Sequence, residues 1–162
     1  TKGAYAGLQS EERHIAEAIA VNLRESFTLS VPIICVIVGE GGSGGALGIG
    51  IGNRILILEH SYYSVISPEG CAAILWKDRS FADQAAEALK ITGEDLLDLK
   101  LADEIIPEPA GGAHINPEKA AEYLKDSILR NIKELKLLTG EAVRADRYKK
   151  FRKMGQFEGE IN

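Results

Sequence analysis

The stretch of sequence that decides the fold is Gly39–Gly52, GEGGSGGALGIGIG, which holds eight of the chain's 17 glycines. It directly follows the apolar run Ile33–Val38, whose β-branched residues predict a buried strand. Because glycine has no Cβ, the chain after this strand can turn at positive φ, and a ligand can approach its main chain closely. Ala46 and Leu47 predict the first turn of a helix, whose free N–H groups favour an anion or a developing oxyanion.

Two nucleotide-binding motifs can be compared with this stretch. A Walker-type phosphate loop needs Lys-Ser or Lys-Thr after its last glycine, and Gly45-Ala46 stands there instead, which excludes that loop. Gly39–Gly44 fits the dinucleotide pattern GxGxxG, and Glu59 follows 20 residues after Gly39. However, the helix after this pattern would be short and interrupted by glycines. This objection weakens the dinucleotide interpretation without excluding it. A nicotinamide or nucleotide binder stays open as an alternative.

The same stretch also contains the serine-hydrolase pattern GxSxG over Gly41–Gly45, centred on Ser43. Asp103 and His114 follow in the chain order that such hydrolases use. A chance match is common in so glycine-rich a stretch. The remaining alternative is architectural, because glycines also allow a helix and a strand to pack closely.

Length and composition predict one ordinary globular domain, with 162 residues, 45% of them hydrophobic, and a net charge of −5. The negative charge argues against a general nucleic-acid binder, and no apolar run is long enough for a membrane span. Cys35 and Cys71 are 36 positions apart and lack metal-site spacing, so free thiols in a reducing compartment are expected. Since the chain begins with Thr1 and shows no signal peptide, we expect residues before it to be missing.

The rest of the chain predicts alternating helices and strands, typical of an α/β fold with a parallel sheet. A helix starts near Ser10 and runs to Leu29. Further strands are predicted at 55–58, 62–66 and 104–106, and helices at 68–76, 81–90, 93–99, 118–138 and 141–154. The last of these helices carries six cations against two carboxylates, which predicts a solvated face or a docking surface for an acidic partner or a phosphorylated cofactor tail.

Four segments taken together resemble one family, the α subunits of bacterial and plastid acetyl-CoA carboxylase carboxyltransferase. They are Gly3–Gly7, Gly39–Leu47, Tyr63–Ala72 and Ile105–His114, in the family's order and spacing, and the match runs from Thr1 to about Tyr148. The resemblance implies a crotonase-like spiral of parallel β-sheet and helices, of which this chain holds the C-terminal half. Residues 1–162 would then be a single carboxyltransferase domain from a longer subunit, with a crotonase-like α/β part at 1–116 and a helical part at 117–162.

This chain departs from the family at two points. The family usually has prolines where Lys2 and Ala6 stand, so the first loop is expected to be less rigid. The family's N-terminal half, with the first strands of the spiral, lies upstream of Thr1. A non-catalytic assembly fragment is therefore a second alternative.

The resemblance implies transfer of a carboxyl group from carboxybiotin to acetyl-CoA, which gives malonyl-CoA for fatty-acid synthesis. It implies as partners a β subunit in an α2β2 assembly, the biotin carboxyl carrier protein that presents carboxybiotin, and biotin carboxylase. Zinc would be carried only by the β subunit, with no metal site on this chain. The implied location is the bacterial cytoplasm or the plastid stroma, with no membrane or dedicated nucleic-acid binding.

The resemblance carries the family's oxyanion hole over onto Gly44 and Gly45, whose backbone N–H groups would be the catalytic donors, toward biotin in preference to the thioester. Ser43 would then be a turn residue, and Tyr5 would pack against the floor of the site. The residues expected to bind substrate or biotin are Tyr5, Gly41, Gly42, Ser43, Ala46, Ser67, Pro68, Glu69 and Gly70.

Overall fold

Five parallel strands form two sheets in the computed structural model, which describes residues 3–155. The larger sheet has the order β1-β3-β5, formed by Ile34–Ile37, Arg54–Leu58 and Glu104–Ile106. The smaller sheet pairs β2 (Glu40–Gly42) with β4 (Tyr62–Ser64). All three strand pairs are parallel, which confirms the predicted α/β alternation.

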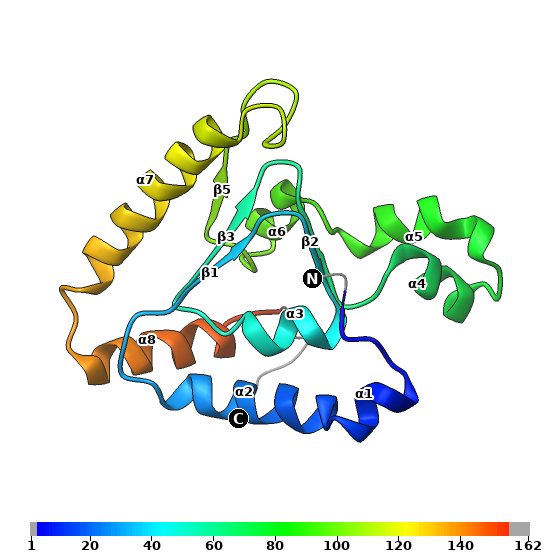
Figure 1. Ribbon diagram of the computed structural model, residues 1–162, viewed down its shortest axis with the longest axis horizontal. Helices are drawn as coiled ribbons and strands as arrows, with labels where there is room; N and C mark the ends of the chain where they lie inside the picture. The colour runs from blue at the N-terminus through cyan, green and yellow to red at the C-terminus, as the bar shows by residue number, and fades with distance from the viewer. Residues whose placement is uncertain (1–2, 156–162) are drawn as a thin grey trace.

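A strand–strand–helix unit occurs twice in succession. In the first unit β1 is followed by β2 and by helix α3 (Ser43–Ile49), and in the second β3 is followed by β4 and by α4 (Pro68–Leu75). The first strand of each unit joins the larger sheet and the second strand joins the smaller one. The chain therefore advances as a spiral, and each new unit lies beside the one before it (Figure 1).

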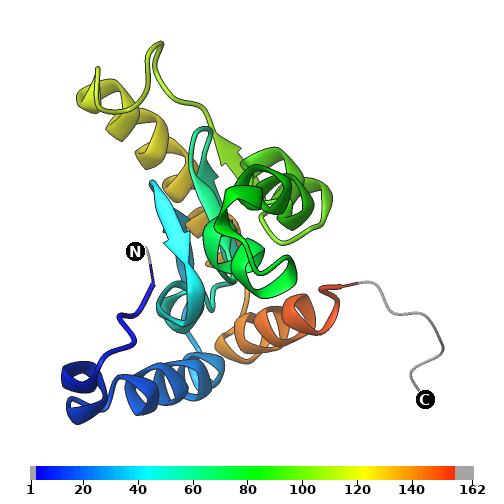
Figure 2. The ribbon, with the colours of Figure 1, turned by 90° about the vertical axis from the view of Figure 1, so that its right-hand side faces the viewer.

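Helices surround the sheets on several sides. Helices α2 and α3 pack together, α7 contacts β1 and β5, and an arm that contains α4 and α5 projects at the right of Figure 1. Figure 2 shows α8 and α2 below the sheets. The remaining bounds are α1 Leu8–Glu12, α2 Ile15–Thr28, η1 Arg79–Phe81, α5 Ala82–Leu89, α6 Gly93–Asp98, α7 Pro117–Leu135 and α8 Gly140–Arg152.

The core lies on both faces of β3, whose residues 55–58 are all buried. Leu56 and Leu58 pack with Ile106 toward α7, while Ile57 packs on the other face with Leu96. This alternation is the period of two expected of a strand covered on both faces. None of the helices in the described part of the chain is long and apolar enough to cross a membrane.

Most predicted helix starts are confirmed by their caps. The Ser67 hydroxyl accepts a hydrogen bond from the Gly70 N–H, and Pro68 is the first helical residue of α4. Thr92 and Asp95 form a reciprocal capping box at α6. Such side-chain caps satisfy N–H groups that the helix itself leaves without an acceptor. Because the capping residue lies within one turn of these N–H groups, the helix start can be predicted from the sequence.

The single helix predicted from Ser10 to Leu29 is wrong. The structure has two helices there, α1 and α2, separated at His14, which takes a left-handed backbone with φ 57°. The expected turn after Val38 is also more regular than predicted. Residues 40–42 form β2, and α3 begins at Ser43 instead of at Ala46.

The cationic face predicted for the last helix is only partly solvated. Arg147 in α8 is fully buried and donates hydrogen bonds to the carbonyl groups of Ser26, Leu29 and Val31. The Lys150 side chain is 13% exposed and pairs with Asp103. Burial lowers the pKa of Lys150, and the contact with Asp103 opposes that shift. Two of the six cations therefore hold α8 against the rest of the fold.

Candidate active site

The candidate site is built around the first turn of α3. Gly42 is the N-cap residue and makes no side-chain cap, because it has no side chain. Ser43, Gly44 and Gly45 follow as the first three helical residues, so the helix supplies no acceptor for their N–H groups. The two predicted donors, Gly44 and Gly45, therefore occupy the part of the helix where backbone N–H groups and the positive dipole end favour negative charge.

An apolar cavity of about 280 Å³ lies beside this turn. Ser43 and Gly44 line it from α3, and Lys90 lines it from the end of α5. Its walls include the side chains of Leu89, Leu96 and Leu101. Among residues 3–155, no His, Asp or Glu lines this cavity. It can therefore offer backbone donors in apolar surroundings, but no carboxylate or imidazole base.

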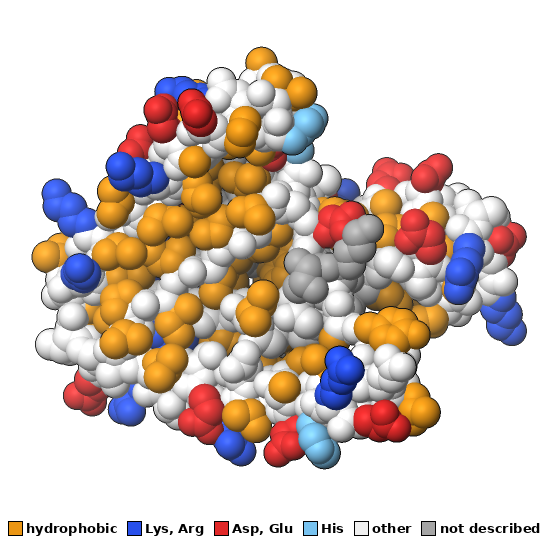
Figure 3. Space-filling model, viewed as in Figure 1, with side chains coloured by type: hydrophobic (Ala, Val, Ile, Leu, Met, Phe, Trp, Pro, Cys, Tyr) orange, Lys and Arg blue, Asp and Glu red, His pale blue; other side chains and the backbone are white. Residues whose placement is uncertain are grey.

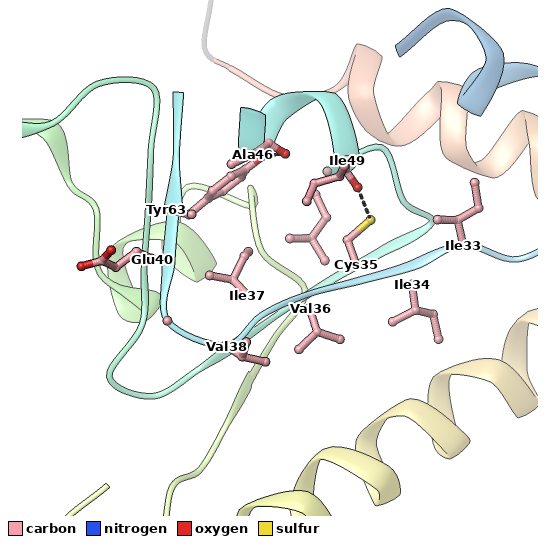
Figure 4. Close-up of a pocket in the computed structure, with 14 residues that line it drawn as sticks. Ile33, Ile34, Cys35, Val36, Ile37, Val38, Glu40, Ala46, Ile49 and Tyr63 are labelled. Carbon is pink, nitrogen blue, oxygen red and sulfur yellow. Dashed lines mark hydrogen bonds between the residues drawn. The ribbon is translucent and has the colours of Figure 1, made fainter. Parts of the chain in front are cut away.

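Tyr63 of β4 separates this cavity from a second one of about 380 Å³, because it lines both. Its ring lies beneath α3 (Figure 4), and its hydroxyl is 3.5 Å from the Ala46 carbonyl oxygen. A Cβ on Gly50 would stand 2.5 Å from that hydroxyl, so a larger residue at position 50 would displace the Tyr63 side chain. Burial raises the pKa of Tyr63, and the neighbouring Cys35 thiol adds to the shift. Sequence reasoning gave Tyr63 no role, although the glycine opposite it was a usable signal.

The second cavity runs along β1 and is lined by the strand's apolar residues together with Glu40 and Ile49 (Figure 4). The thiol of Cys35 donates a hydrogen bond to the Ile49 carbonyl oxygen at 3.2 Å. Burial raises the pKa of this thiol, and the charges of Lys150 and Arg147 partly oppose the shift. Cys35 is therefore held mainly in its neutral form.

The N-terminal segment lies against the other side of the turn. A Cβ on Gly45 would stand 2.8 Å from the Ala4 backbone nitrogen and 3.0 Å from the Gly3 carbonyl carbon. Gly45 therefore allows residues 3–4 to approach α3 closely. The prediction that Tyr5 packs against the floor of the site is wrong. Tyr5 is 77% exposed, and its ring lies over Gly7.

The other predicted binding residues do not all lie in one cavity. Ser43 lines the cavity beside Gly44, whereas Gly41 and Ala46 line the cavity along β1. Gly42 is buried at the start of the helix. Residues 67–70, comprising Ser67, Pro68, Glu69 and Gly70, form the start of α4 and line neither cavity. Their role in binding stays a prediction.

The hydrolase pattern is matched locally but lacks its partners. Ser43 stands between a strand and a helix with φ 55°, as in a nucleophile elbow. However, the Asp103 carboxylate accepts from the Ile55 N–H and pairs with Lys150. The His114 ring lies against Gly112, in the loop after β5. Each of the three residues has its own separate surroundings, so the structure does not assemble a triad.

The dinucleotide pattern also lacks its expected context. A strand of the second sheet, β2, stands between β1 and α3, where a Rossmann fold has a single tight turn. Glu59, the candidate ribose ligand, accepts a hydrogen bond from the Glu108 N–H at 3.0 Å. Across residues 3–155 there is also no group of three His, Cys, Asp or Glu side chains that could hold a metal ion.

Two solved structures share the arrangement of strands and helices seen in this chain. A transcarboxylase 12S structure with methylmalonyl-coenzyme A bound aligns with a TM-score of 0.58 and 14% identity, over 99% of this chain and 28% of that one. A Pseudomonas malonate decarboxylase hetero-tetramer in complex with coenzyme A aligns with a TM-score of 0.52 and 19% identity, over 76% of this chain and 52% of that one. These likenesses confirm the crotonase-like fold.

Sequence relatives agree along nearly the whole chain. The acetyl-coenzyme A carboxylase carboxyl transferase subunit alpha of Acaryochloris marina is 59% identical over 157 residues, and that of Gloeobacter violaceus is 54% identical over 158 residues. The alignments cover 97% and 98% of this chain and 48% of each relative, so the chain spans about half the length of these relatives. The family model described as "Acetyl co-enzyme A carboxylase carboxyltransferase-like" matches residues 1–155. The chain therefore belongs to the acetyl-coenzyme A carboxylase carboxyltransferase α-subunit family.

Proposed function

We propose that this chain supplies one backbone oxyanion hole of an acetyl-CoA carboxylase carboxyltransferase. The reaction transfers the carboxyl group of carboxybiotin to the methyl carbon of acetyl-CoA and gives malonyl-CoA. The observation that carries the proposal is the position of Gly44 and Gly45, in the first turn of α3 and, for Gly44, directly at an apolar cavity. Family membership supports the substrate class, and the geometry of α3 supports the two donors.

The residues beside α3 fit the needs of this reaction. Carboxybiotin, when presented, supplies the carboxyl group and the nitrogen that takes the methyl proton. A carbon–nitrogen bond breaks, a carbon–carbon bond forms, and an oxygen gains negative charge on the way. The N–H groups of Gly44 and Gly45 would donate to that oxygen, and the leucine walls would keep water away from it. A cavity without an imidazole or carboxylate suits a reaction whose base comes with the substrate.

We propose the same partners that the family resemblance implies. They are a β subunit with the zinc site and the second oxyanion hole, the biotin carboxyl carrier protein, and biotin carboxylase. The name of the relatives, subunit alpha, supports a multi-subunit complex. The proposed location is the bacterial cytoplasm or the plastid stroma.

A chimera tests this function. Residues of the Acaryochloris marina α subunit that match this chain are replaced by the chain, and the product is mixed with that organism's β subunit, acetyl-CoA and carboxybiotin. We expect malonyl-CoA to form only when both subunits are present. An assembled chimera that forms no malonyl-CoA, while the unaltered Acaryochloris pair does, would show that the chain does not support the reaction.

A further inference from the structure

One charged side chain lines the apolar cavity beside α3. It belongs to Lys90, and of the residues that the structure describes no other charged one lines this cavity. The Lys90 side chain is 56% exposed, which places it at the mouth of the cavity. On the face that Figure 3 shows, Lys and Arg side chains lie mainly on the outer helices, around an apolar area. A cation on an apolar cavity that Gly44 also lines departs from this distribution.

The backbone around Lys90 is held beside β4. Lys90 follows the last residue of α5 and takes a left-handed backbone with φ 53°. The carbonyl of the next residue, Ile91, accepts a hydrogen bond from the Tyr63 N–H at 3.1 Å, and Thr92 forms an antiparallel bridge with Tyr62. Because Tyr63 lines the same cavity, these contacts keep the Lys90 backbone at the cavity wall.

The Lys90 ammonium contributes little to the fold itself. Its ion pair with Asp95 is long, with 3.9 Å between Nζ and Oδ1, and a partly exposed pair of this kind adds little stability. Asp95 is engaged through its other oxygen, which accepts hydrogen bonds from the N–H and the hydroxyl of Thr92. The lysine therefore keeps the capacity to donate hydrogen bonds to a bound anion.

We propose that Lys90 binds the carboxylate of carboxybiotin, the group that the reaction transfers, while the biotin ring occupies the apolar cavity. The inference deepens the proposed function and rests on it. The carboxylate is attached to the nitrogen beside the ureido carbonyl, so a ureido oxygen near Gly44 brings the carboxylate into the same cavity. One cation matches one carboxylate, whereas the phosphate groups of coenzyme A carry several charges and would need more cations than line this cavity.

The course of the reaction predicts which kinetic constant Lys90 affects. When the carbon–nitrogen bond breaks, its electron pair stays with biotin, and the carboxylate leaves as neutral carbon dioxide. The negative charge therefore moves away from Lys90 toward the ureido oxygen. An interaction that is stronger in the bound substrate than in the transition state lowers KM and does not raise kcat. Lys90 should thus govern the KM for carboxybiotin, and the N–H groups of α3 should govern kcat.

Three variants of the Acaryochloris chimera, assembled with its β subunit, test this assignment. Lys90→Gln should raise the KM for carboxybiotin by about tenfold, without lowering kcat or changing the KM for acetyl-CoA. Lys90→Arg keeps the charge and should stay within about threefold of the parent. Lys100→Gln is the matched control, because Lys100 has the same left-handed backbone, with φ 60°, and lines neither cavity. An unchanged KM for carboxybiotin, a rise in the KM for acetyl-CoA alone, or equal effects of the two glutamine variants would overturn the proposal.

A binding measurement separates this proposal from the proposed function. Biotin methyl ester with a free carboxylate on its ureido nitrogen is compared with the same compound after methylation of that carboxylate, by ligand-observed NMR without acetyl-CoA. The assembled chimera should bind the anionic compound about tenfold more tightly, and its Lys90→Gln variant should bind the two equally. If the chimera shows this preference but forms no malonyl-CoA, the proposed reaction is wrong and the carboxylate site stands. A chimera without the preference would rule out the role of Lys90, whether or not malonyl-CoA forms.

Discussion

The guanidinium of Arg147 in α8 donates a 2.9 Å hydrogen bond to Oδ1 of Asn53, the residue that precedes β3, and both side chains are fully buried. Asn53 in turn donates to the Val143 carbonyl oxygen at 2.8 Å. Because Arg147 also bonds Ser26 at the end of α2 and the carbonyl groups of Leu29 and Val31 that follow it, one side chain ties the last helix to the chain leading into β1.

Removing this buried cation should be costly. Arg147→Met leaves four acceptors without their charged donor, so the free energy of unfolding should fall by at least about 3 kcal/mol. Arg144→Met, one turn earlier and exposed, should change it by less than about 0.5 kcal/mol. Urea unfolding of the two variants measures the difference. Equal midpoints would show that Arg147 does not hold α8 in place.

The Glu104 carboxylate gives the stability of the fold a defined pH dependence. Burial pushes its pKa up, but hydrogen bonds from Ser127, Arg130 and Asn131 in α7 outweigh burial and lower the pKa below 4.5. A carboxylate with a lowered pKa stabilises the fold above its unfolded pKa, and the contribution disappears as pH falls through the folded pKa. Glu104→Gln should therefore destabilise by about 1–3 kcal/mol at neutral pH and by much less in acid. A difference from wild type that stays constant from pH 7 to pH 3 would contradict this.

Gly44 and Gly45 should differ in their tolerance of alanine. A Cβ on Gly44 would make an ordinary 3.5 Å contact with Ile19, so Gly44→Ala should stabilise α3 by up to about 1 kcal/mol. At Gly45 the Cβ would meet the Ala4 nitrogen at 2.8 Å, so Gly45→Ala should displace residues 3–4 from α3. NMR shifts of the Gly3 and Ala4 amides report the displacement. If both variants left these shifts unchanged, the close contact would be absent in solution.

Ser43 should be dispensable as a nucleophile. Its hydroxyl contributes at most about one hydrogen bond of 0.5–1.5 kcal/mol, so Ser43→Ala in the assembled chimera should keep turnover within about tenfold of the parent. The parent should also remain unlabelled by a fluorophosphonate probe, because no histidine in the described part of the chain lines the cavity beside Ser43. Covalent labelling that Ser43→Ala abolishes would favour the hydrolase pattern instead.

The sequence predicted the features that depend on local chemistry. Apolar runs located β1 and β3, and capping residues such as Ser67 and Thr92 located helix starts, because caps act within one turn. The split at His14 and the short β2 were missed. Neither has a propensity signal, and β2 exists only because β4 pairs with it. The burial of Arg147 also depends on tertiary contacts, which the local sequence does not indicate.

Within the candidate site, the glycine pair was located correctly at the start of a helix, but its surroundings were not. Glycine density indicates where a backbone can be approached, and it does not indicate what approaches it. The close partner of Gly45 is Ala4, and Tyr5, which was expected to pack against the floor of the site, is exposed. Lys90 could not have been found, because nothing in its sequence context marks it as lining the same cavity.

The central claim is that the Gly45 N–H donates to the charged oxygen during carboxyl transfer. Gly45→Pro and Gly45→Ala add the same Cβ against Ala4, but only proline removes the N–H. The ratio of their kcat values therefore reports the donor, provided that NMR shifts show α3 intact in the proline variant, because proline also restrains Gly44. Both variants are made in the Acaryochloris chimera and must first show assembly with the β subunit. The proposal predicts that the proline variant is slower than the alanine variant by about 10²–10³, as for loss of one oxyanion-hole donor. Equal kcat values in two folded, assembled proteins would contradict it.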